Sequence, residues 1–378
     1  MKIIDYPIIS KKELKPREEY AHYCTFKAPD KHPRDIVMDY MVKMATTEWT
    51  PSHTWTTNWK EQGHFPVNLT YEKGKKYYGI PYSSTKAPLC EFNEFLKDGV
   101  FTPNSPYYEE IVGNHCSSSM FMSFQQVEDI FYMNYPCDLR PTSYRAGKVM
   151  FPKGIEAPPS RSKDIPEDWV SETAFAFNSK EAMINGYASL DKGDILIKDI
   201  NNSGHTRMVR KVKTVRKEGG TIDTANSIVY AIEQTNAWFD EKQNSTWWID
   251  KEYTFDKLYK MQFMPVTLCI YHRDDPIIED AVIAMTEENT PETIKNGLNG
   301  AIHTNFPLSF LLVTVKDANG EIKGKSFIYN LFSVYDLPIG ELYDELGIKR
   351  LPKGKYRFTL TVGIARGSTV FEDFEFEI

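Results

Sequence analysis

The sequence predicts an α+β fold in which a helix packs on an antiparallel sheet and an all-β sandwich follows. A loop gives way to a helical pattern of apolar residues at Cys116. Three strand-like segments separated by turns then occupy residues 190–234. Short alternating segments continue from there to the end of the chain. At 378 residues, the chain is long enough for two or three domains.

Composition and charge argue against two kinds of partner. The formal net charge of −7 does not suit a nucleic-acid partner, which needs a basic face. No stretch approaches the roughly 18 apolar residues of a membrane span. Residues 1–7 lack the long apolar core of a signal peptide, so we expect either a protein that stays inside the cell or one whose natural start differs.

The cysteines do not form a known framework. Their number is odd and no C-x-x-C pair occurs, which fits neither a disulfide scaffold nor a zinc ribbon. We therefore expect at least one free thiol, and no metal or other cofactor. The five cysteines are Cys24, Cys90, Cys116, Cys137 and Cys269.

Residues 1–69 are expected to form a helical and aromatic segment that packs on the following domain. A helix should begin after His32 and end near Pro51. Residues 75–83 contain glycine and proline, which predicts a bent, exposed segment. Three tryptophans of the first segment are expected in its core: Trp49, Trp55 and Trp59.

Cys116 lies where a loop turns into a helix. Ser117 or Ser118 is expected to cap that helix. The unpaired N–H groups and positive end of a helix lower the pKa of a thiol and stabilise an oxyanion, which a nucleophilic cysteine requires. A buried structural cysteine is the alternative. The apolar positions with helical spacing are Met120, Phe121, Phe124, Val127, Ile130 and Phe131.

An insertion follows around residues 136–185. Residues 136–168 are rich in proline, serine and basic side chains, which predicts a long loop that forms a lid or a cleft wall. A short helix is expected to start at residues 166–169. An antiparallel meander of three strands then follows, in which His205 opens the second strand and Glu233 ends the third.

The last part of the chain, residues 263–378, is expected to form an Ig-like β-sandwich. Short strands are expected at residues 265–271, 310–315, 356–362 and 371–378, with turns between them. These segments contain no cluster of titratable residues. We therefore interpret this part as an accessory or binding module.

Cys116, His205 and Glu233 together suggest chemistry. A nucleophilic cysteine needs a base within hydrogen-bond reach and a third group that orients the base. A helix packed on an antiparallel sheet can bring three such residues together from distant positions. Each has a plainer explanation alone, since His205 could be an ordinary strand-edge histidine and Glu233 a solvated charge.

The order of these motifs resembles the papain-like NlpC/P60 cysteine peptidases and the related CHAP amidases. The resemblance covers roughly residues 70–240 and implies a papain-like domain over residues 70–262. The chain departs from the family pattern at His115, where aspartate is usual, and at Ser118, where glycine is frequent. The matching segments are Gly79-Ile80-Pro81-Tyr82, His115-Cys116-Ser117-Ser118, Lys192-Gly193-Asp194-Ile195-Leu196, Ser203-Gly204-His205 and Ile232-Glu233-Gln234.

The resemblance implies a role for each site residue. Cys116 would be the nucleophile, His205 the base that later protonates the leaving amine, and Glu233 the residue that orients the imidazole. Gln234 and Asn236 are the alternatives for this third role. Three further residues are expected to contact the substrate: Tyr82, Ser117 and His115.

The resemblance also implies a function. We expect a cysteine peptidase or amidase that cleaves an amide bond in a bacterial cell-wall peptide, commonly between D-glutamate and a diamino acid, through an acyl-enzyme. Its partner would be a peptidoglycan stem peptide in the cell envelope or outside the cell, although no export signal is visible. Two alternatives stay open: an inactive papain-like protein that binds carbohydrate or protein through its sandwich, and the same fold acting on another acyl or amide substrate.

Overall fold

The protein consists of two compact units. A computed structural model describes residues 13–61, 63, 66–130, 139–141, 148–157, 169–200, 203–331 and 334–378. The first unit contains Pro29–Thr85 and Phe95–Ile278. The second contains the described part of Ser10–Ala28 together with Lys86–Glu94 and Glu279–Ile378. Antiparallel sheets dominate both units and helices are few, so the protein is a mixed α and β protein, as the sequence predicts at this level.

A six-stranded sheet forms the centre of the first unit. Its strand order is β12-β11-β10-β9-β13-β8, and all neighbouring strands are antiparallel. The meander expected over residues 190–234 is confirmed as β9, β10 and β11. The strands are β8 (Val149–Met150), β9 (Ile195–Ile200), β10 (Ser203–Lys213), β11 (Ile228–Gln234), β12 (Trp247–Thr254) and β13 (Met264–Leu268).

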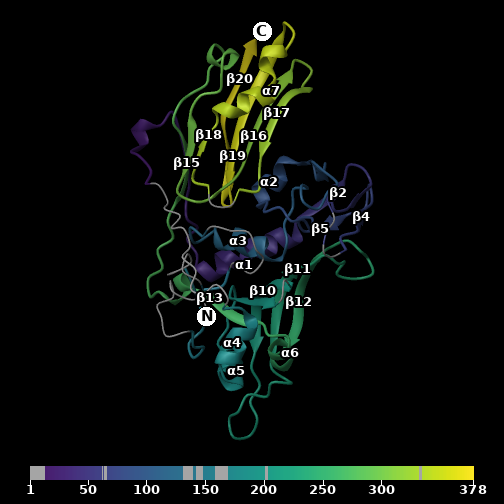
Figure 1. The fold of residues 1–378 in the computed structure, drawn as a ribbon, viewed down its shortest axis with the longest axis vertical. Coiled ribbons are helices and arrows are strands. Elements are labelled where there is room, and N and C mark those ends of the chain that lie inside the picture. Colours follow the sequence, from purple (N-terminus) through teal and green to yellow (C-terminus); the bar gives the residue numbers. More distant parts are fainter. Residues whose placement is uncertain are drawn as a thin grey trace. The chain divides into compact units, whose positions relative to one another are not determined.

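Two helices accompany this sheet. Helices α1 (Pro33–Thr46) and α3 (Cys116–Phe124) pack against each other, and α3 packs against β10 (Figure 1). His32 caps α1, and Pro33 suits its first turn because that N–H would have no helical partner. The helix ends at Thr46 and not near Pro51, because the backbone becomes extended at Thr47 and continues as a strand.

Aromatic side chains form the core of the N-terminal part of this unit. Trp49 and Trp55 are buried, and the Trp55 ring stacks on Tyr71 with centroids 4.1 Å apart. This confirms their expected packing role, whereas Trp59 is only half-buried and its ring packs edge-on against Tyr108. The strands that carry these rings and their neighbours are β2 (Glu48–Pro51), β3 (Trp55–Thr57), β4 (Leu69–Tyr71), β5 (Tyr77–Tyr78), β6 (Leu96–Lys97) and β7 (Val100–Phe101).

Three shorter helices complete the unit: α4 (Ser171–Phe177), α5 (Lys180–Ala188) and α6 (Phe255–Lys260). They pack against β9, β13 and β12 respectively. Several predictions fall outside the described residues, namely Phe131, Cys137, most of the expected loop over residues 136–168, and residues 166–168 of the expected short helix. Within the described part of the chain, no helix combines the length and apolar character needed to cross a membrane.

The second unit contains two four-stranded antiparallel sheets. Apolar side chains of both sheets, such as Ile283, Val313 and Leu360, belong to one buried cluster. One sheet has the order β17 (Ile322–Ile328), β16 (Leu308–Asp317), β19 (Lys355–Ile364) and β20 (Gly367–Glu377). The other has the order β1 (His22–Phe26), β14 (Ala281–Met285), β15 (Ala301–Thr304) and β18 (Asp336–Pro338). Two short helices also belong to this unit, α2 (Leu89–Glu94) and α7 (Tyr343–Leu346).

Long-range strand pairing places two segments differently from the sequence-based expectation. The strand expected at residues 265–271 is β13, which ends at Leu268 and pairs with β9 in the first unit. A 3₁₀ turn, Cys269–His272, follows it. Strand β1, from the segment expected to pack on the first domain, pairs with β14 of the second unit.

Candidate active site

Cys116 is the first residue of helix α3. His115 precedes the helix with an extended backbone, and its N–H donates to the Ser118 hydroxyl at 2.8 Å. This is the position of an N-cap residue, so the expectation that Ser117 or Ser118 caps the helix is wrong. Ser118 instead closes the capping box from inside the first turn. Cys116 therefore lies at the positive end of the helix dipole, as expected.

The segment that carries Tyr82 runs beside the Cys116 loop. The Asn114 N–H donates to the Pro81 carbonyl at 3.0 Å, and the Ser83 N–H donates to the Asn114 carbonyl at 2.9 Å. Tyr82 and Asn114 form a parallel bridge. This pairing brings Tyr82 close to the start of α3 although 34 positions separate Tyr82 from Cys116.

This segment is buried, and the expectation of an exposed bend over residues 75–83 is wrong for its second half. Tyr82 is only 8% exposed. The cause is a set of hydrogen bonds that pins the backbone. The Ile80 carbonyl accepts one from Gln234 Nε2 at 2.8 Å and another from Trp247 Nε1 at 2.9 Å.

Gly113 permits the close approach of these two segments. A Cβ atom at this position would lie 2.4 Å from the Pro81 carbonyl oxygen. We therefore expect Gly113→Ala to lower the free energy of unfolding by about 1–3 kcal/mol, as overpacking of a rigid site does. Urea denaturation measures this. Gly297→Ala is the matched control, because a Cβ atom there meets nothing within 4 Å, and an equal loss in both variants would contradict the prediction.

His205 and Glu233 face each other on neighbouring strands. His205 Nε2 hydrogen-bonds Glu233 Oε2, and Glu233 is 1% exposed. Glu233 is therefore not a solvated charge. The same oxygen accepts a hydrogen bond from Arg207 Nε at 2.8 Å, and Oε1 accepts one from the Tyr253 hydroxyl.

The Cys116 thiol and the His205 imidazole lie close enough for each to shift the pKa of the other. Because Nε2 of His205 is engaged with Glu233, Nδ1 is the ring nitrogen left for the thiol. The structure thus joins the three residues expected from the sequence into one chain of contacts. Cys116 lies on α3, His205 on β10 and Glu233 on β11.

The electrostatic interactions among Cys116, His205 and Glu233 favour a charged thiolate and a charged imidazolium over their neutral forms. Burial by itself raises the pKa of Cys116, but hydrogen bonds to His115 and His205 and the charges of these rings hold that pKa well below its ordinary value. Burial by itself lowers the pKa of His205, but hydrogen bonds and charges from Cys116 and Glu233 outweigh it and raise the pKa to about 9. Both shifts favour a thiolate–imidazolium pair.

Glu233 stays ionised in this setting. Burial by itself raises the pKa of a carboxyl group. Here the hydrogen bond and charge of His205, the charge of Arg207 and the Tyr253 hydrogen bond outweigh burial and lower the pKa to about 2. The third member of the chain is thus a carboxylate at any pH near neutrality.

The other expected site residues have different positions. The Ser117 hydroxyl is 3.3 Å from His115 Nδ1, and both residues are buried. The Tyr82 ring stacks on Tyr108 with centroids 5.5 Å apart. The side chain of Gln234 holds the Ile80 carbonyl, and Asn236 Nδ2 donates to the Pro66 carbonyl at 3.0 Å. These two alternatives for the third role therefore bind backbone elsewhere, whereas Glu233 contacts His205.

Sequence reasoning missed Arg207, Tyr253 and Tyr108. A signal for Arg207 was present, since side chains two positions apart on a strand share a face and Arg207 follows His205 by two. Tyr253 and Tyr108 join the site through pairing and stacking between distant segments, for which the local sequence carries no signal. In the part of the chain that the structure describes, no group of three or more histidine, cysteine or acidic side chains could hold a metal ion.

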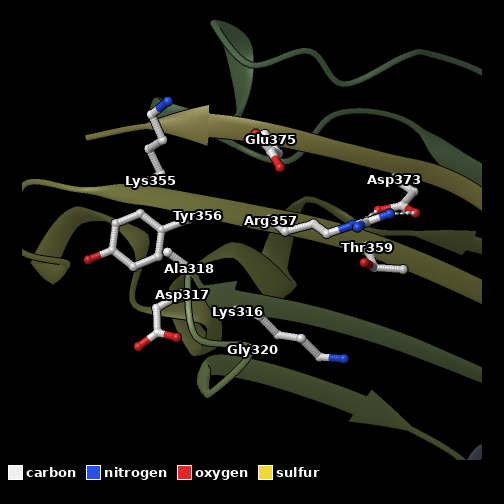
Figure 2. Close-up of a pocket in the computed structure, with 10 residues that line it drawn as sticks. All are labelled: Lys316, Asp317, Ala318, Gly320, Lys355, Tyr356, Arg357, Thr359, Asp373 and Glu375. Atoms are coloured by element: carbon white, nitrogen blue, oxygen red, sulfur yellow. Dashed lines mark hydrogen bonds and ion pairs between the residues drawn. The ribbon is translucent and has the colours of Figure 1, made fainter.

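A separate hollow of about 520 Å³ lies on the second unit, over β16, β19 and β20. Figure 2 shows that Arg357 and Asp373, which line it, point toward each other. Their ion pair has two hydrogen bonds, of 2.5 and 2.6 Å. The hollow is lined by a mixture of acidic and basic side chains without a cysteine or histidine, so it lacks the groups for nucleophilic chemistry. The lining residues are Lys316, Asp317, Ala318, Gly320, Lys355, Tyr356, Arg357, Thr359, Asp373 and Glu375.

Comparisons with known proteins found no match for the chain among protein-family models, curated proteins or solved structures.

Proposed function

We propose that the first unit is a papain-like cysteine hydrolase of the NlpC/P60 type that cleaves an amide bond. One observation carries the proposal: the Cys116 thiol, at the start of a helix, lies beside an imidazole that in turn hydrogen-bonds a buried carboxylate. A nucleophile, a base and an orienting group in this order are the components of covalent acyl transfer. The packing of the cysteine helix on an antiparallel sheet supports the papain-like assignment.

The reaction follows from these positions. The Cys116 thiolate attacks the carbonyl carbon of the amide, and the backbone N–H of Cys116 at the start of α3 helps to stabilise the oxyanion. The His205 imidazolium gives its proton to the leaving nitrogen as the C–N bond breaks, which leaves a thioester on Cys116. Water then attacks the thioester while His205 takes a proton from it. The acid leaves and the thiolate–imidazolium pair is restored.

Glu233 and the tyrosines have supporting roles in this proposal. Glu233 fixes the ring orientation of His205 and stabilises the imidazolium. Tyr82, with Tyr108 stacked on it, lies near Cys116, because the backbone of Tyr82 forms a bridge with Asn114. We propose that this pair forms one wall of the substrate site, beside Ser117 and His115.

The substrate we propose is a peptidoglycan stem peptide, cut between D-glutamate and a diamino acid in the cell envelope or outside the cell. The support for this choice is the resemblance of the motifs to NlpC/P60 enzymes. For the second unit we propose an Ig-like β-sandwich with an accessory role. Its two antiparallel sheets around one buried cluster support that assignment.

Incubation with purified stem peptides tests the proposal, with mass spectrometry of the products. We expect the protein to release the peptide fragments and Cys116→Ala to release none. Simple peptide and acyl-amide substrates form a second panel. Cleavage confined to that panel would overturn the wall-peptide assignment but support the cysteine hydrolase. No cleavage in either panel, with an unreactive Cys116, would overturn the hydrolase and favour a binding protein.

A further inference from the structure

The Glu233 carboxylate has more partners than the three-residue chain requires. Besides His205, it accepts hydrogen bonds from Arg207 Nε and from the Tyr253 hydroxyl. Arg207 lies on β10 and Tyr253 on β12, so Glu233 on β11 is held from both neighbouring strands. A carboxylate held by three donors cannot rotate away from the imidazole without breaking at least one of these bonds.

Arg207 is itself rigidly placed. Its side chain is 7% exposed, and its guanidinium carbon lies 3.9 Å from the centroids of the Tyr253 and Phe263 rings. Aromatic rings on a desolvated guanidinium attract its charge and restrict its rotation. Arg207 therefore presents a fixed positive charge to Glu233.

The buried groups alternate in charge. The order is Arg207 positive, Glu233 negative, His205 positive and Cys116 negative, so the four charges cancel. Other titratable groups nearby are Tyr82, Tyr108 and His115, which interact electrostatically with Cys116, and Lys257, whose ammonium lies 5.3 Å from the centre of the Tyr253 ring. Without Arg207 the buried set would carry one net negative charge in a low-dielectric region, which is costly.

We propose that Arg207, supported by Tyr253, is a positioning residue of this cysteine site. It holds the Glu233 carboxylate toward His205, and its charge allows the thiolate and the imidazolium to coexist in a buried place. This inference rests on the proposed function and extends it to a fourth and a fifth residue. Neither residue contacts the thiol according to the structure.

The proposal predicts the direction in which two pH transitions move when Arg207 is replaced. Loss of one buried positive charge favours proton uptake by every group near it. The formation of the thiolate and the loss of the His205 proton should therefore both move to higher pH in Arg207→Met. Methionine has a similar length and can pack between the two rings, so a packing role alone would leave both transitions in place.

Two alkylating reagents of different charge distinguish the two transitions. The rate with neutral iodoacetamide follows the thiolate, whereas the rate with anionic iodoacetate also falls when the nearby imidazolium loses its charge. In Arg207→Met we expect both transitions to move up by about one pH unit, the order of shift that a nearby charge causes. Arg207→Lys, which keeps the charge, should return both toward the wild-type values. Tyr253→Phe should shift the thiolate transition upward by a smaller amount.

Arg210→Met is the matched control. Arg210 lies on the same strand and pairs with Asp250 at 2.6 Å, but this pair is exposed to solvent, so its loss should leave both transitions unchanged. A folded Arg207→Met with wild-type transitions would overturn the inference. If Arg207→Met does not fold, wild-type profiles and rates in both Arg207→Lys and Tyr253→Phe would overturn it. An ordinary thiol at Cys116 in the unmodified protein would instead contradict the proposed function itself.

Discussion

Replacing His205 with alanine is expected to slow the alkylation of Cys116 by iodoacetamide about 30-fold at neutral pH. The imidazolium helps to hold the pKa of Cys116 well below its ordinary value, against the opposing effect of burial. Without it, His115 alone opposes the effect of burial, and a thiol whose pKa returns to near 8.5 is only about 3% ionised at pH 7. Peptide mapping by mass spectrometry after timed exposure to the reagent measures the rate at Cys116 alone.

Three other cysteines of the protein serve as internal controls for the alkylation rate. Cys24, Cys90 and Cys269 are free cysteines outside the chain of contacts around His205. Their labelling rates should not change in His205→Ala. Slowing confined to Cys116 supports the thiolate–imidazolium pair, whereas an unchanged Cys116 rate in a folded variant would show that His205 does not activate the thiol.

The second large effect is expected on stability. Glu233→Gln keeps the size of the side chain but leaves the Arg207 guanidinium without its buried counter-charge. Breaking a buried ion pair on one side costs about 3–5 kcal/mol, because the remaining charge is desolvated and unpaired. We therefore expect urea denaturation at neutral pH to report a loss of this size for Glu233→Gln.

Asp250→Asn is the matched control for this variant. It breaks the solvent-exposed pair with Arg210, which lies on β10 as Arg207 does, and a loss below about 1 kcal/mol is expected. If both variants lose the same small amount, Glu233 is not the counter-charge of a buried arginine, and the alternating arrangement of charges fails.

The difference in unfolding free energy between the wild type and Glu233→Gln should depend on pH. The pKa of Glu233 is lowered from its ordinary value of 4.5 to about 2 in the folded protein. Between these values the unfolded chain takes up a proton that the folded protein does not bind, so the stabilisation by Glu233 is lost as pH falls. The gap in unfolding free energy between the wild type and Glu233→Gln should therefore be full above pH 4.5 and shrink toward pH 2.

Much of the candidate site could be predicted from local signals in the sequence. Cys116 follows a glycine-containing turn and opens a helical pattern, and His205 and Glu233 lie on strands with clear turn boundaries. The structure places His205 between Cys116 and Glu233. The cap of α3 was less predictable, because histidine at the N-cap position carries a weaker signal than the serines that follow it.

The remaining features depend on contacts between distant parts of the chain. The segment around Tyr82 looked exposed from its glycine and proline, but Gln234 and Trp247 bury it by binding the Ile80 carbonyl. Strand pairing likewise decides that β13 joins β9 and that β1 joins β14. Register and partner choice of this kind follow from the whole fold and not from local periodicity.

The most direct measurement is the rate of Cys116 alkylation in the unmodified protein as a function of pH. With iodoacetamide we expect the rate to reach half its maximum well below pH 8.5 and to stay constant through neutrality, because the thiolate is already formed. With iodoacetate we expect a fall near pH 9, where His205 loses its proton. A half-maximal rate at or above pH 8.5 with both reagents would mean an ordinary thiol and would contradict the activated Cys116–His205–Glu233 chain.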